Sequence, residues 1–348
     1  MLPKKEFFFS FITKFILGII LGFVISLAWF KYSSLGATTG FAQLCVQQNE
    51  LSPEAQYTID IILKEVQTKD CVAASHEIRN TDELYLSGTH IQDLTPLASF
   101  SHINKLYLAD NQISDITPLA SFTRLTTLEL SNNQIRDINA LSKMKRLKTL
   151  WMWNNQVKDL SPLSSLKSLN RLYVPFNQIS DLNPLSSLKN IEVLILDNNK
   201  ISDISSLSFL ENLKGVSIAN NLIQDIYALS KLTKLKTLIV PNNKISDISP
   251  LSKFISLKGL ILDNNMVSNL EPLSSLQNIK LLYLHNNGIT NIKPLSHLQN
   301  LSELELGNNK IIDLSPLSSL KQLKVLNVIN NPLKSQICPV QPHSICQF

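Results

Sequence analysis

The chain has 348 residues, of which 44% are hydrophobic and 17% charged, and it contains 9 glycines against 15 prolines. No glycine belongs to a G-x-G-x-x-G or G-x-x-x-x-G-K-[ST] motif, which argues against dinucleotide and P-loop nucleotide binding. Of the formal net charge of +5, the first 31 residues carry +3 from four lysines and one glutamate, and the near-neutral remainder lacks the clustered positive charge expected of a nucleic-acid-binding protein.

The first predicted element is an apolar segment over residues 7–30, in which Lys14 is the only charged residue. About 20 apolar residues span a bilayer core, so residues 1–31 are predicted to form a transmembrane signal-anchor. A cleaved signal peptide is the alternative, with Ser26-Leu27-Ala28 as a small-x-small cleavage site. In both cases the positive residues lie mainly before the segment, which predicts that the rest of the chain is exported.

A linker over residues 32–40 is expected to lead into an N-terminal cap over residues 41–80. Ser52 and Pro53 predict the start of an amphipathic helix, with serine as N-cap and proline at the first helical position. A solenoid end exposes its apolar interior unless a capping unit covers it. The apolar side chains of this helix are therefore expected to lie on the first coil of the array; they are Ile59, Ile61, Ile62 and Val66.

Twelve copies of an L-x-L-x-x-N-x-[ILV] motif follow at a period of 22, from LYLSGTHI to LNVINNPL, and the repeat array is predicted over residues 81–331. This is the leucine-rich repeat signature. Its asparagine position is occupied by Thr89 in the first copy and then by Asn111, Asn133, Asn155, Asn177, Asn199, Asn221, Asn243, Asn265, Asn287, Asn309 and Asn331.

Each position of the repeat has a physical role. The alternating leucines predict a strand with one buried face, and the asparagine amide can satisfy backbone groups that the following turn leaves unpaired. The second half reads D-[IL]-x-P-L, and its proline predicts a turn or 3₁₀ segment on the convex side. The aspartates suggest a calcium ladder or turn capping; Asn269 and Asn291 in this column, and the lack of G-G-x-G-x-D, favour capping.

The four cysteines flank the array. Proximity favours the pairs Cys45–Cys71 and Cys338–Cys346 among three possible connectivities, with the first bond expected to pin the cap helix across its span and the second to staple a C-terminal cap over residues 332–348. Two disulfides fit an oxidising compartment. A zinc site is disfavoured because no C-x-x-C motif occurs.

The 22-residue repeat with D-[IL]-x-P-L resembles the repeats of the internalin family. The cysteine-bearing flanks, FAQLCVQQNELSPEAQYTIDIILKEVQTKDC and NPLKSQICPVQPHSICQF, resemble the caps of exported cyanobacterial leucine-rich repeat proteins. The resemblance implies an α/β-type solenoid shaped as a horseshoe, with about 12 parallel strands on the concave side, and a role in protein binding. No immunoglobulin-like domain, LPxTG-type wall anchor or lipoprotein cysteine matches that family, so host-cell invasion is not carried over.

No constellation of nucleophile, acid and base is recognisable, and the six histidines are scattered, so an enzyme, a cofactor and a metal site are not expected. The concave face is the predicted site. Between the strand leucines it presents Tyr85, Tyr107, Glu129, Trp151, Tyr173, Ile195, Ser217, Ile239, Ile261, Tyr283, Glu305 and Asn327.

One region of that face concentrates aromatic residues and is predicted to bind a partner: Tyr107, Glu129, Trp151, Trp153, Tyr173 and Phe176. Clusters of Trp and Tyr are typical of binding hot spots, whereas cross-strand stacking that merely stabilises the sheet is the alternative. Tyr283, His285 and Glu305, with Lys280 nearby, form a second candidate contact.

The leading hypothesis is a non-catalytic module that binds a protein or peptide outside the cytoplasmic membrane, attached through its N-terminal helix or secreted if the leader is cleaved. A monomer is favoured, although the sequence leaves the oligomeric state open. An intracellular phosphatase-regulating leucine-rich repeat subunit and a glycan-binding or structural envelope protein are the alternatives.

Overall fold

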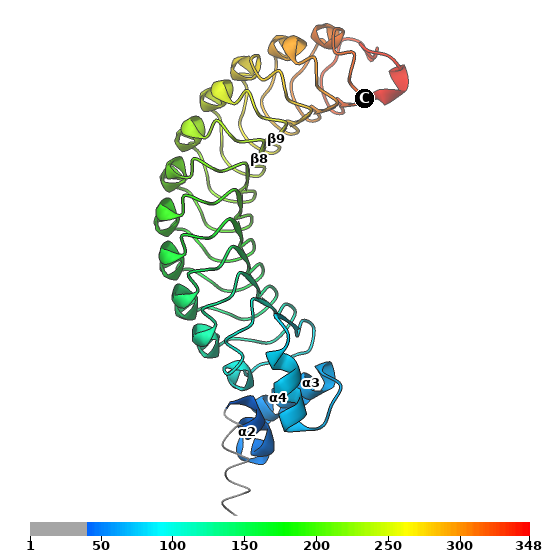
Figure 1. The fold of residues 1–348 in the computed structure, drawn as a ribbon. Helices are drawn as coiled ribbons and strands as arrows, with labels where there is room; N and C mark the ends of the chain where they lie inside the picture. The colour runs from blue at the N-terminus through cyan, green and yellow to red at the C-terminus, as the bar shows by residue number, and fades with distance from the viewer. Residues whose placement is uncertain (1–39) are drawn as a thin grey trace, which may run out of the picture.

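The computed structural model describes residues 40–348, so the predicted leader over residues 1–31 lies outside the described residues. None of the helices within residues 40–348 is long and apolar enough to cross a membrane. The described chain is a curved solenoid with α-helices at its N-terminal end, strands along its inner side and 3₁₀ helices along its outer side (Figure 1).

The N-terminal end contains three α-helices, α2 (Phe41–Val46), α3 (Pro53–Glu65) and α4 (Cys71–Arg79), with η1 (Gln48–Glu50) between the first two. Helix α3 is the helix expected from the sequence, and the Ser52 hydroxyl accepts a hydrogen bond from the Ala55 amide at 3.1 Å. Helices α2 and α4 were not predicted. The signal for α4 was Asp70, whose carboxylate accepts from the amides of Val72 and Ala73.

Both predicted cysteine pairs are confirmed. The Cys45–Cys71 bond joins α2 to the first residue of α4, so it closes the chain across the span of α3, which lies between the two cysteines in sequence. Ile59 and Ile62 of α3 are fully buried, whereas Ile61 and Val66 are only partly buried against the same core.

Thirteen parallel strands pair in chain order, one more than the expected number. They are β1 (Glu83–Tyr85), β2 (Lys105–Tyr107), β3 (Thr127–Glu129), β4 (Thr149–Trp151), β5 (Arg171–Tyr173), β6 (Val193–Ile195), β7 (Gly215–Ser217), β8 (Thr237–Ile239), β9 (Gly259–Ile261), β10 (Leu281–Tyr283), β11 (Glu303–Glu305), β12 (Val325–Asn327) and β13 (Cys346–Gln347). The additional strand comes from the cysteine-containing tail, where Cys346 pairs with Leu326 and is bonded to Cys338.

The convex side carries the predicted 3₁₀ helices: η2 (Thr95–Leu97), η3 (Thr117–Ser121), η4 (Asn139–Lys143), η5 (Ser161–Ser165), η6 (Asn183–Ser187), η7 (Ser205–Phe209), η8 (Tyr227–Lys231), η9 (Ser249–Lys253), η10 (Glu271–Leu273), η11 (Lys293–His297) and η12 (Ser315–Leu317), with η13 (His343–Ile345) in the tail. The aspartates cap these turns as predicted. Asp247 accepts from the Ser249 amide at 2.8 Å, and Asn269 accepts from Glu271 at 3.0 Å in the same way.

The asparagine column ties neighbouring coils together, which confirms its predicted role. Asn133 Oδ1 accepts from the Ile113 amide at 2.9 Å, and its Nδ2 donates to the carbonyls of Leu108 and Leu130 at 2.9 and 3.0 Å. The leucines around it are excluded from solvent. The concave face is therefore a rigid sheet whose residue positions are fixed by a 22-residue register.

Candidate functional site

The concave column predicted from the sequence is formed by the third residue of each strand from β1 to β12. Tyr107 lies beside Glu129, Glu129 beside Trp151, and Trp151 beside Tyr173. Adjacent strands are about 4.8 Å apart. The register therefore brings side chains that are 22 residues apart in sequence into one continuous row.

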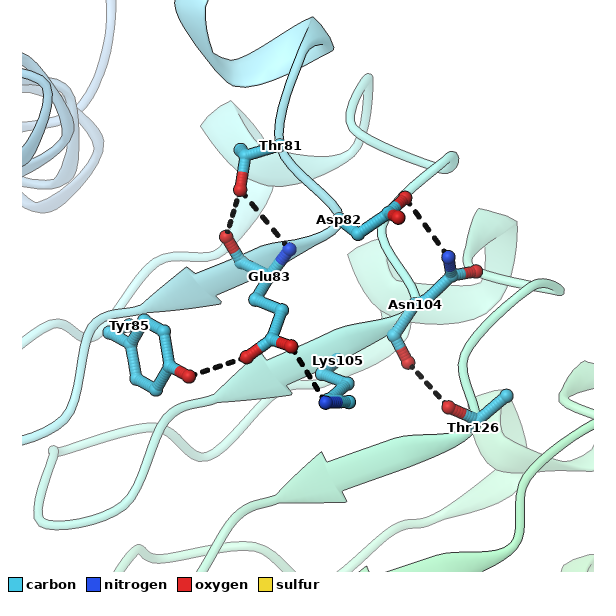
Figure 2. Close-up of polar contacts among 7 residues, drawn as sticks. All are labelled: Thr81, Asp82, Glu83, Tyr85, Asn104, Lys105 and Thr126. Atoms are coloured by element: carbon cyan, nitrogen blue, oxygen red, sulfur yellow. Dashed lines mark hydrogen bonds and ion pairs between the residues drawn. The ribbon is translucent and has the colours of Figure 1, made fainter.

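The row begins with a polar network that holds the Tyr85 hydroxyl beside Glu83 and Lys105 (Figure 2). The Tyr85 hydroxyl donates to the carboxylate of Glu83, which also pairs with Lys105 at 2.6 Å. The hydrogen bond to Glu83 raises the pKa of Tyr85 to about 12, and the bond from Lys105 holds the pKa of Glu83 below its ordinary value. The rings of Tyr85 and Tyr107 stack at 4.6 Å. This end of the sheet is thus a preorganised aromatic surface.

The predicted aromatic patch, meaning Tyr107, Glu129, Trp151, Trp153, Tyr173 and Phe176, is brought together over β2 to β5 and the turns that follow β4 and β5. Trp151 and Tyr173 stack at 5.5 Å with an interplanar angle of 13°. Both are half-buried by their neighbours, whereas Trp153 and Phe176 are 39% and 54% exposed. The most accessible apolar surface therefore lies just beyond the strand ends.

Phe176 has an unusual backbone conformation. Its φ is +53°, the left-handed region that Asn occupies at the equivalent position of most other repeats, including Asn154 and Asn198. For residues other than Gly and Asn this region costs about 1 kcal/mol or more. Because the Phe176 side chain is exposed, packing of its ring does little to offset this cost.

Glu129 supplies the acidic group within the aromatic patch. Burial raises the pKa of its carboxyl, and this effect is partly offset by the Ser131 amide, which donates to Oε1 at 3.3 Å. Because its strand lies between those of Tyr107 and Trp151, it places a hydrogen-bond acceptor among aromatic rings. That arrangement can recognise an N–H group or a cation.

The second candidate contact is also held by specific interactions. Tyr283 lies beside Glu305 in the row, and its hydroxyl donates to Glu303 at 3.0 Å. His285 Nε2 lies 2.8 Å from Asn308 Nδ2, and its backbone amide donates to Asp263. A Cβ on Gly307 would lie 2.7 Å from His285 Nδ1, so glycine leaves room for the imidazole.

Lys280 is not part of this second contact. It directly precedes β10, and its backbone carbonyl accepts from the Ser302 amide at the edge of the sheet.

Sequence reasoning missed two half-buried carboxylates that follow strands of the sheet, Asp197 and Asp263. Asp197 accepts from the Ser217 hydroxyl and the Ala219 amide, and burial raises its pKa. In the sequence, each of these aspartates lies two positions after the last residue of a strand, where small residues and prolines are common in the other repeats.

The repeats match a known family profile, described as "Leucine Rich repeats (2 copies)", over residues 82–121, 123–165, 167–209, 211–253 and 299–341. The chain belongs to the leucine-rich repeat family. No curated protein matches its sequence.

Among solved structures, the chain is similar to an internalin, InlF, of Listeria monocytogenes, with 28% identity and a TM-score of 0.72 over 82% of this chain and 93% of that one. A leucine-rich repeat protein of Leptospira interrogans shares the fold at 21% identity and a TM-score of 0.61, over 76% and 82% of the two chains. The plant peptide hormone receptor RGFR1, solved in complex with RGF2, also shares it at 20% identity and a TM-score of 0.64, over 72% of this chain and 44% of the receptor.

Proposed function

We propose that this protein is a non-catalytic binding module that holds a protein or peptide on its concave aromatic patch. The observation that carries the proposal is the exposure of Trp153 and Phe176 beside the stacked pair of Trp151 and Tyr173. In addition, Phe176 adopts a left-handed backbone conformation that is unfavourable for phenylalanine. Binding hot spots are enriched in Trp and Tyr that pack in the centre of an interface. A leucine-rich repeat fold is typically a scaffold for interactions rather than an enzyme.

Two observations support the wider setting of this proposal. Both cysteine pairs are disulfide-bonded, as is usual for proteins of oxidising compartments. The plant receptor in complex with RGF2 has the same fold. We place the module outside the cytoplasmic membrane, attached through residues 1–31 or released after their cleavage.

Alanine variants with a matched control test the proposal. Once an interaction screen has identified a partner, Trp153→Ala and Phe176→Ala are each expected to weaken its binding by about 2 kcal/mol, the scale of a hot-spot residue. Phe209→Ala is the control, because Phe209 is 52% exposed but lies in η7 on the convex side. Unchanged affinity in both patch variants would overturn the assignment.

A glycan array run in parallel tests the principal alternative, which is that the aromatic patch binds a glycan. Aromatic platforms also stack on sugar rings, so a sugar that binds the wild type but not Trp151→Ala or Tyr173→Ala would move the proposal from protein to glycan recognition.

A further inference from the structure

A row of lysines runs along one edge of the sheet. The residue directly before the strand is lysine in four successive repeats: Lys214, Lys236, Lys258 and Lys280. The backbone amide of each later lysine donates to the carbonyl of the one before, at 2.7–2.8 Å, so the four lie on adjacent coils about 4.8 Å apart. All four are exposed. We call them the lysine row.

Most of this charge is unneutralised. Lys214 pairs with Glu192 at 2.8 Å, but the other three lysines of the row make no ion pair within residues 40–348. The opposite edge of the sheet, where the chain leaves the strands, leads to the capping aspartates, among them Asp203, Asp225 and Asp247. The capping aspartates and the lysine row therefore lie on different edges of the sheet, and their charges cancel in the near-neutral net charge of the repeats.

The same edge is hollowed next to the row. A cavity of about 480 Å³ lies at the edge of the sheet where the chain enters strands β3 to β7. Its lining includes Thr127, Lys148, Thr149, Asn170, Arg171 and Asn190. The side chains of Lys148 and Arg171 have no hydrogen-bond or ion-pair partner among the described residues. Glu192, the acidic residue of the lining, pairs with Lys214 at 2.8 Å; this hydrogen bond holds the pKa of Glu192 below its ordinary value, and the nearby charge of Arg171 adds to the effect.

The composition of this edge selects a class of ligand. Hydroxyl and amide side chains both donate and accept, which matches the hydroxyl groups of sugars. Lysine pairs with anions as a point charge, and a row with a repeat of about 4.8 Å suits a linear polymer that carries regularly spaced anions. No aromatic side chain lines the cavity, so it offers no platform on which nucleic-acid bases would stack.

We infer that this edge of the sheet, from the cavity at Lys148 and Arg171 along the lysine row, binds an acidic polysaccharide. The cavity holds a sugar residue by its hydroxyl groups and its anionic group, and the lysine row pairs with the anions of the residues that follow. This surface is separate from the aromatic patch, so the protein can hold a glycan on its edge and a protein or peptide on its concave face.

Polygalacturonate is a suitable probe, and uncharged dextran, polyglutamate and oligothymidylate are the comparisons. Binding of each to the full chain is measured by biolayer interferometry at low and high salt. The expected result is binding of polygalacturonate that weakens with added salt. Equal binding of dextran would exclude charge recognition, and polyglutamate or oligothymidylate bound as tightly as polygalacturonate would overturn the glycan assignment.

Charge-neutralising variants locate the site. The triple variant Lys236→Gln, Lys258→Gln, Lys280→Gln is expected to weaken polygalacturonate binding roughly tenfold, as the loss of three exposed ion pairs implies. Its matched control removes three exposed lysines from the segments that follow the strands: Lys158→Gln, Lys200→Gln and Lys244→Gln.

Equal loss in the two triple variants would overturn the location, since it would mean that only total charge matters. A second variant, Lys148→Gln with Arg171→Gln, is expected to lose affinity as well. Trp153→Ala should bind polygalacturonate like the wild type, so a failure of this inference is distinguishable from a failure of the proposed protein-binding patch.

Discussion

The Asn221 side chain connects two neighbouring coils, and replacing it with alanine is predicted to destabilise the array. Its Oδ1 accepts from the Ile201 amide at 2.9 Å, and its Nδ2 donates to the carbonyls of Leu196, Ile218 and Ala219 at 3.0–3.2 Å. Asn221 is 7% exposed, so water cannot easily replace these partners.

The magnitude follows from which groups lose their partners. The carbonyls of Leu196 and Ile218 retain amide donors from Asn199 and Asn243, at 2.9 and 3.0 Å. The Ile201 amide loses the Asn221 side-chain oxygen that it donates to, and it is left buried without a partner. One orphaned buried donor costs about 1–3 kcal/mol, and the weakened bonds to the carbonyls add about 1 kcal/mol. The expected loss is therefore about 3 kcal/mol.

Hydrogen exchange at individual amides is the appropriate assay, because repeat proteins can open locally and a single unfolding free energy is not assured. Asn221→Ala should accelerate exchange at Ile201 more than at strands β2 and β11. An orphaned buried donor should cost more than about 0.5 kcal/mol, so a loss of protection at Ile201 below that value would refute the expected destabilisation.

Asn221→Asp sharpens the test. Aspartate keeps the acceptor for Ile201 but directs a carboxylate toward three carbonyl oxygens, so burial and repulsion should raise its folded-state pKa above the unfolded value of about 3.9. Stability is then lost as the pH rises from about 4 through the folded pKa. A variant as stable as the wild type at pH 7 would contradict the role of the amide donor.

Three further predictions concern the cap and the concave face. Burial raises the pKa of Glu129, so the wild type should lose stability as the pH rises past the ordinary value of 4.5; Glu129→Gln should remove this loss in thermal unfolding, and an unchanged profile would argue against it. Replacing Cys45 and Cys71 with alanine opens a loop spanning a sequence separation of 26 and should cost about 3 kcal/mol in urea unfolding of the N-terminal cap; equal stability would contradict this. Gly307→Ala should force the His285 ring to move, and unaltered imidazole NMR signals would contradict the close approach.

The repeat architecture was accessible from sequence because each coil repeats the same local chemistry. A 22-residue period fixes the strand register, the asparagine fixes the turn, and the D-[IL]-x-P-L segment fixes the 3₁₀ helix. The pairing of Tyr107 with Glu129 and of Trp151 with Tyr173 followed directly from that period.

Features that depend on non-repeating contacts were not accessible. Helices α2 and α4, which the predicted Cys45–Cys71 bond joins, take positions set by packing on the first coil, and β13 forms because the tail returns to β12. The half-burial of Trp151 also depends on the side chains of neighbouring coils. Net charge could not reveal the lysine row, because acidic residues elsewhere in the repeats offset it, although its four lysines are spaced 22 residues apart in the sequence.

Site-specific photo-crosslinking shows whether a partner binds the concave aromatic patch. A benzoylphenylalanine placed at position 176 or at position 209 replaces a phenylalanine of nearly equal exposure, on the concave and convex sides respectively. In the native host, we expect a discrete protein or peptide adduct at position 176 that is absent at position 209. The same adducts at both positions, or an adduct at 209 alone, would contradict recognition by the concave aromatic patch.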